Sequence, residues 1–208
     1  MRIGFCGAHR TGKTTLARAI ARIYHLPLLS SSASAVAARH SFDMAHHNRL
    51  DTGIPMQVEQ LDTMIEGFEE RTEGFVSDRT PLDAAAYLLA DATASAGTPL
   101  SRETTVTYVE KAMALTAKHF DIVILVPPAI TFEPMDGKPP MNEAYQEHHH
   151  MLVRGMLFDD EVSIRSGQIQ RTNTSRLDRI SAVLEFCDPI AREKGMAVPC
   201  DAEQSVAA

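Results

Sequence analysis

The chain has 208 residues, of which 44% are hydrophobic and 23% charged, a composition typical of a water-soluble globular protein. This length fits one α/β domain with a sizeable core and is too short for two full domains. The formal net charge of −7 argues against a general attraction to nucleic acid or to anionic membranes, although a local basic groove stays open. No apolar run approaches the roughly 20 residues that a membrane-spanning helix needs.

The cysteines and the first residues favour an intracellular protein. Cys6, Cys187 and Cys200 are far apart and have no metal-binding spacing, so we expect free thiols in a reducing compartment. Residues 2–6 already read as a buried strand, which leaves no room for a signal peptide. We therefore expect a cytoplasmic protein with no membrane partner.

The first strand leads into a phosphate-binding loop. Residues 7–14 fit the pattern G-x-x-x-x-G-K-[ST], and the residues after them carry apolar side chains at helical spacing over 15–24. Strand, glycine loop and helix form the arrangement that surrounds a polyphosphate with backbone N–H groups and a positive helix end. The residues expected to bind ATP are Gly7, Ala8, His9, Arg10, Thr11, Gly12, Lys13, Thr14 and Thr15.

Two side chains of this loop have expected chemical roles. Lys13 is predicted to reach the β- and γ-phosphates of ATP, and the Thr14 hydroxyl is predicted to bind Mg²⁺. Because Lys13 belongs to a loop, we expect it to face solvent and to pack little.

The rest of the chain alternates between strand and helix patterns. Further strands are predicted at 26–29, 74–78, 121–126 and 168–171, and helices at 35–39, 55–73, 82–92, 102–118, 142–157, 174–185 and 189–194. The alternation predicts a three-layer α/β fold, a five-stranded parallel sheet with helices on both faces. We expect one domain over residues 1–200, followed by a polar tail at 201–208.

Acidic and basic residues follow the third predicted strand. Ligands in such sheets bind at the carboxyl ends of the strands, where Asp78 and Arg79 are expected. Asp78 is predicted to bind Mg²⁺ or to accept a proton from the acceptor, and Arg79 to hold a phosphate. A structural alternative is that Asp78 and Asp83 only cap the helix that follows Pro81.

A lid and an acceptor site are less sharply defined. Residues 129–157 are the candidate lid, which would bring Lys138 and Arg154 to the transferring phosphoryl group. Arg39 could contribute to a basic groove for the acceptor, and Gln60, like Gln57, could read the edge of a base. For each of these residues the alternative is an ordinary surface position.

Two histidine-rich stretches favour solvated surface over metal binding. Residues 40–52 are polar and lack carboxylate or cysteine spacing that would complete a zinc site. His148, His149 and His150 are consecutive on a predicted helix, so they point in different directions and cannot share one metal ion.

The phosphate loop, together with the segment from Asp78 to Asp83 and with Tyr87, resembles the P-loop nucleoside and nucleotide kinases. The likeness is greatest to the small AAA-type kinases of bacteriophages, often labelled deoxynucleoside monophosphate kinases, and it extends to ribosylnicotinamide kinase domains. In the phage group an arginine is more usual at the position of Lys138. One branch phosphorylates 5-hydroxymethyluracil in DNA. The resemblance covers most of residues 1–185 and implies a bacterial or phage-infected host cell.

The resemblance implies an ATP- and Mg²⁺-dependent kinase with a nucleoside- or nucleotide-type acceptor, and leaves DNA as an alternative acceptor and a homodimer open. One departure concerns the second strand, which ends in serines where deoxyribonucleoside kinases carry a catalytic acid. This moves the general base to Asp78 or to an acid such as Asp43. The other readings are a regulatory or motor NTPase and a binding module with an inactive loop.

Overall fold

The computed structural model describes residues 1–30, 36, 38, 39, 41, 50–94, 100–131, 142–160 and 163–198. Its strands are β1 (Arg2–Cys6), β2 (Leu28–Leu29), β3 (Phe75–Ser77), β4 (Ile122–Leu125) and β5 (Arg165–Gln168). Its longer helices are α1 (Lys13–Ile23), α3 (Leu50–Glu69), α4 (Pro81–Ala94), α5 (Arg102–His119), α6 (Glu143–Leu157) and α7 (Arg176–Glu193).

The five strands form one parallel sheet in the order β2-β3-β1-β4-β5. β1 lies in the centre, where Ile3 pairs with Val76 of β3 on one side and with Ile122 of β4 on the other. Because parallel strands end at the same edge, the loops after β1, β3 and β4 come together there. The predicted five-stranded parallel sheet is confirmed.

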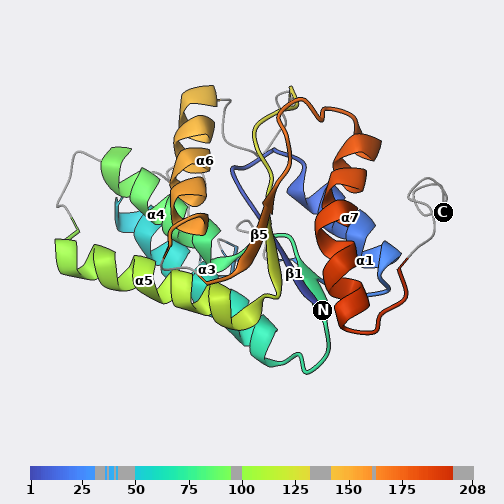
Figure 1. Ribbon diagram of the computed structural model, residues 1–208. Helices are drawn as coiled ribbons and strands as arrows, with labels where there is room; N and C mark the ends of the chain where they lie inside the picture. Colours follow the sequence, from blue (N-terminus) through green and yellow to red (C-terminus); the bar gives the residue numbers. More distant parts are fainter. Residues whose placement is uncertain are drawn as a thin grey trace.

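Helices cover both faces of the sheet (Figure 1), with α1 and α7 on one face and α3, α4, α5 and α6 on the other. A hydrophobic core lies on each face of the sheet, and successive residues of a strand point alternately into one core and the other. Phe5 and Ile124 pack with α1 and α7, whereas Cys6 and Leu125 pack with the other four helices. The near-continuous apolar sequence of β4 follows from burial on both faces.

Side-chain caps fix where three helices begin. The hydroxyls of Ser101 and Ser175 accept backbone N–H bonds at the starts of α5 and α7, and the Asn142 side chain does so for α6. The Ser101 cap was predicted. The α7 cap is one residue later than Thr174, the predicted one.

Three predicted element boundaries were wrong. β5 comprises residues 165–168 instead of 168–171 and is mostly polar, because it is an edge strand, and Phe186 packs on Gly167 with no room for a Cβ. α7 continues through Pro189, where the sequence indicated two helices, since Cys187, Ile190 and Ala191 remain buried in the core. α3 begins at Leu50, five residues before Pro55, which was expected in its first turn.

Several predictions fall outside the described residues. These include Lys138 and residues 132–141 of the expected lid, Asp43, most of the histidine-rich stretch at 40–52, and the tail at 201–208. The single-domain and lid assignments stay predictions. Within the described part of the chain, no helix is both long enough and apolar enough to cross a membrane.

Candidate functional site

The loop between β1 and α1 has the backbone shape that its glycines require. Gly7 has φ of 131° and Gly12 has φ of 85°, in the left-handed region that favours glycine. A Cβ on Gly7 would lie 2.4 Å from the Val126 carbonyl oxygen, so no other residue fits there. Gly12 directly precedes α1, which places the positive end of the helix at the loop.

The Lys13 amine lies inside this loop. Its Nζ donates to the carbonyl oxygens of Gly7 and Ala8, both at 2.6 Å, and the residue is only 6% exposed. Burial lowers the pKa of Lys13 to about 8, although the neighbouring Asp83 carboxylate opposes this shift. The expectation that Lys13 faces solvent was therefore wrong, because the loop folds back over its own lysine.

Oxygen atoms from three segments meet beside the loop. The Thr14 hydroxyl donates to Asp78 Oδ2 at 3.0 Å, and the Ser30 hydroxyl after β2 donates to the same oxygen at 3.1 Å. Asp78 follows β3 directly and is buried. Carboxylate and hydroxyl oxygens are donors that Mg²⁺ prefers, so Thr14 and Asp78 fit the metal-binding role predicted for them.

Asp83 supports the loop from the first turn of α4. Its Oδ2 accepts the Thr80 N–H at 2.8 Å, as in a helix cap, while its Oδ1 accepts the Gly7 N–H at 2.9 Å. The side chain is fully buried, and burial raises the pKa of its carboxyl, although Lys13 and Arg79 oppose the shift. The sequence indicated the cap. The bond to Gly7 was missed, since 76 residues separate the partners.

Arg79 follows Asp78 directly and places its guanidinium group at the same edge of the sheet. Its guanidinium carbon lies 5.6 Å from the centre of the Tyr87 ring. Burial alone would lower its pKa, but Tyr87 and the carboxylates of Asp83 and Asp78 raise it. Its Nη1 is buried and has no hydrogen-bond partner in the described part of the protein.

Helix α6 contacts the loop through two side chains near its start. Gln146 Nε2 donates to the His9 carbonyl oxygen at 2.7 Å, and the Tyr145 ring lies 6.1 Å from the His9 ring. His149 packs against Tyr87, with ring centres 3.9 Å apart. His149 and His150 are buried, so the expectation of a surface run holds only for His148. One face of α6 packs on α4, which a run of three histidines does not signal.

The remaining predicted residues are spread more widely. Thr11 is buried and its hydroxyl donates to the Ala8 carbonyl oxygen, whereas Thr15 is exposed. Gln60 is buried on α3 and Arg39 is exposed. Arg154 is exposed eight residues after Gln146 on α6, about 12 Å further along the helix, so the structure does not bring it to the loop.

Arg179 was not anticipated from the sequence. It belongs to the first turn of α7, and its Nη2 donates to the Thr11 carbonyl oxygen at 2.8 Å. No local pattern distinguishes it from the exposed Arg176 three residues earlier, because only the packing of α7 on α1 directs it to the loop.

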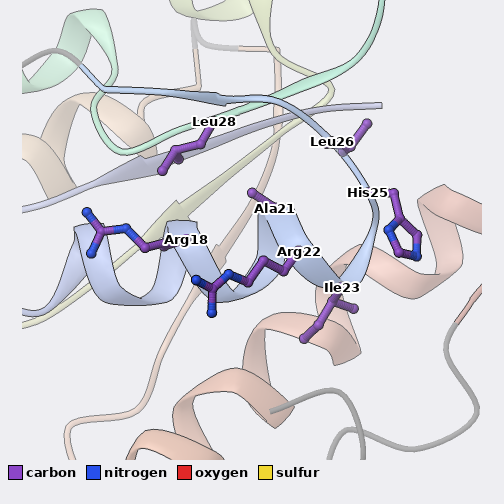
Figure 2. Close-up of a pocket in the computed structure, with 7 residues that line it drawn as sticks. All are labelled: Arg18, Ala21, Arg22, Ile23, His25, Leu26 and Leu28. Atoms are coloured by element: carbon purple, nitrogen blue, oxygen red, sulfur yellow. The ribbon is translucent and has the colours of Figure 1, made fainter. Parts of the chain in front are cut away.

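Two pockets differ in their relation to the loop. One of about 280 Å³ lies beside it and is lined by Pro128, Ile130, Gln146 and Glu147, among others. Another of about 720 Å³ lies between α1 and β2, away from the loop (Figure 2). The guanidinium groups of Arg18 and Arg22 and the ring of His25 point in different directions there, so the pocket holds no convergent set of polar groups.

No group of three or more histidine, cysteine or acidic side chains in the described segments could hold a metal ion by itself. The expectation that the histidine-rich stretches do not bind metal stays a prediction, and His40, His46 and His47 lie outside the described residues. A magnesium ion at Thr14 and Asp78 would take its other ligands from nucleotide and water.

Comparisons with solved structures show the same fold in kinases. A structure of deoxyadenosine kinase from M. mycoides with the products dCMP and dCDP superposes with a TM-score of 0.68 and 15% identity, covering 91% of this chain and 100% of that one. NadR protein in complex with NR superposes with a TM-score of 0.64 and 17% identity, covering 95% of this chain but 51% of that one. At these identities the likeness establishes the P-loop kinase fold alone.

Sequence comparisons complete this picture. No curated protein matches the chain. A family model described as an AAA domain matches residues 2–167, which is most of the chain. The chain therefore belongs to this AAA domain family.

Proposed function

We propose that the protein is an ATP-dependent kinase that transfers the γ-phosphate to a nucleoside- or nucleotide-type acceptor. The observation that carries this proposal is the bond between the Thr14 hydroxyl and Asp78 at the mouth of the phosphate loop. It places a hydroxyl and a carboxylate for Mg²⁺ next to the loop that would hold the triphosphate. The kinase fold of the similar structures supports the same proposal.

The site residues then have distinct tasks. Lys13 would leave the Gly7 and Ala8 carbonyl oxygens and neutralise charge on the β- and γ-phosphates. Asp78 would accept the proton of an acceptor hydroxyl, and Arg79 would donate from Nη1 to a phosphate oxygen. Bound Mg²⁺ would supply charge compensation for the phosphates at Thr14 and Asp78.

The acceptor would lie between Asp78 and the first half of α3. Phe68 stacks on Phe75 at the start of β3, with ring centres 5.4 Å apart. Measured along α3 toward its start, Gln60 lies about 12 Å and Gln57 about 16 Å from Phe68. Measured along β3, Asp78 lies about 10 Å beyond Phe75. With α3 running antiparallel to β3, the two amides would lie at or beyond the level of Asp78.

Both amides are buried, and Gln57 Oε1 has no hydrogen-bond partner among the described residues. A buried amide oxygen of this kind can accept an N–H from a nucleobase. In M. mycoides deoxyadenosine kinase, the structures contain bound dCTP or dATP, and NadR binds NR. These ligands support a nucleoside-type acceptor here.

ADP release with a panel of acceptors tests the proposal. Free nucleosides, nucleoside monophosphates and single-stranded DNA containing 5-hydroxymethyluracil would each be incubated with Mg·ATP and the full chain. We expect acceptor-dependent ADP release with at least one of them and none with the Lys13→Ala variant. ADP release that is the same without any acceptor would instead indicate a regulatory NTPase, and the absence of nucleotide binding would indicate an inactive loop.

A further inference from the structure

The first turn of α7 delivers an arginine to the phosphate loop. Besides the bond from Arg179 Nη2 to Thr11, a Cβ built on Gly12 would lie 3.1 Å from Arg179 Nη1 and 3.4 Å from Ile130 Cδ1. The guanidinium and the Ile130 side chain therefore form the wall of the loop on the β4 side. Thr14 and Asp78 stand on the other side, next to β3.

This guanidinium has no counter-ion within the described residues. Arg179 is only 3% exposed, and burial lowers its pKa with no carboxylate opposing the shift. The neighbouring acid, Asp178, binds the Ser175 hydroxyl instead. Arg179 Nε has no hydrogen-bond partner in the described part of the protein.

Such an arrangement is unfavourable in the empty protein. A buried charge without a counter-ion loses its hydration and gains little in return. Its place in the first turn of a helix adds repulsion from the positive helix end. A neutral donor could equally satisfy the Thr11 carbonyl oxygen, so the hydrogen bond alone does not account for a charged residue. An anion at the loop would account for it.

We propose that Arg179 is a nucleotide-binding residue that contacts the phosphates of the bound nucleotide on their ribose side. The proposal rests on nucleotide binding by the loop, as the proposed function does. With the transferring phosphate next to Asp78, the phosphate chain would cross the loop toward Arg179 and Ile130. Arg179 would then supply a cation from the rigid core, independent of any lid.

Binding of ADP, ATP and adenosine to the full chain, without an acceptor, tests this inference. Arg179→Met keeps an unbranched apolar stem and removes the guanidinium and its charge. Arg176→Met is the matched control, because Arg176 is an exposed arginine in the same helical turn. We expect ADP to bind about 10- to 100-fold more weakly to Arg179→Met, as expected for a lost charge-assisted contact, and adenosine affinity to change little. The control should bind like wild type.

Thermal unfolding separates direct contact from a structural role. Without nucleotide, Arg179→Met should melt no lower than wild type, because an uncompensated buried charge is removed. With ADP, its increase in melting temperature should be smaller than that of wild type. Arg179→Lys, which keeps the charge, should recover part of the ADP affinity.

Three outcomes would overturn the inference. Unchanged ADP affinity in Arg179→Met would do so, as would equal losses for ADP and adenosine together with a lower melting temperature, which would mark a structural residue. In both cases the proposed function would stand, since wild type still binds nucleotide. Wild-type protein that binds neither ADP nor ATP would overturn both proposals.

Discussion

Asp78 and Asp83 lie five residues apart at the edge of the same sheet, yet their surroundings differ. Asp78 accepts hydrogen bonds from two hydroxyls, which a metal ion or acceptor can replace. Asp83 accepts two backbone N–H groups and is closed off from solvent. Residue type and sequence position do not distinguish the two carboxylates. Their hydrogen-bond partners do, because they show which carboxylate is available for chemistry and which one supports the loop.

Lys13 borders both carboxylates, so its removal should have the largest effect. Lys13→Ala should reduce phosphoryl transfer by at least about 10³-fold, as for other charge contacts to a transferring phosphoryl group. Its melting temperature without nucleotide should fall modestly, because the Gly7 and Ala8 carbonyl oxygens lose their donor and Asp83 loses a neighbouring cation. Turnover near that of wild type, measured by ADP release, would contradict the assignment of the loop.

Asp78→Asn should separate the two carboxylates by activity. It keeps the size of the side chain and removes the charge, so we expect kcat to fall by about 10²–10⁴-fold, as for loss of a general base. The fall should appear in kcat more than in ADP affinity, because the charge acts on the reacting centre. A nearly silent variant would move the base elsewhere, with Asp43→Asn as the next test.

Asp83→Asn should show the opposite profile. Losing a charged acceptor for the Gly7 and Thr80 N–H groups should lower the free energy of unfolding by about 1.5–3 kcal/mol. ADP should bind more weakly, because the loop loses its support. Urea unfolding and nucleotide titration measure the two effects. If only kcat fell while stability and affinity were retained, Asp83 would share the chemistry with Asp78.

The smallest effect concerns pH and the support that α6 gives to the loop. Burial lowers the pKa of His150 to about 4, with Arg171 and Arg154 adding to the shift and Glu147 opposing it. An unfolded histidine takes up a proton below about 6.5. Between these values the unfolded state binds more protons, so the free energy of unfolding should decrease as the pH falls from about 6.5 to about 4.

His150→Gln should reduce the slope of the unfolding free energy against pH. The reduction should correspond to at most one bound proton. His149, whose pKa burial also lowers well below its ordinary value, should behave alike, with positive charge on Lys13 and Arg79 as the next causes. His148→Gln is the control, since His148 is exposed. Equal slopes in all three variants would show that the buried histidines do not govern acid stability.

The sequence by itself determined the phosphate loop, the parallel five-stranded sheet and the place of Asp78. Each depends on local patterns, namely glycines at fixed spacing, apolar runs that form buried strands, and the turn after a strand. The Ser101 cap was predictable for the same reason, because its hydroxyl bonds a backbone N–H only three residues away.

Only the tertiary structure decided which polar residues support the loop. Asp83 reaches Gly7 across 76 residues, Gln146 reaches His9 across 137, and Arg179 reaches Thr11 across 168. These partners meet because α4 and α6 pack on one face of the sheet and α7 on the other. Burial of His149 follows from the same packing, since Tyr87 of α4 covers it and the sequence neighbours of His149 do not specify that contact.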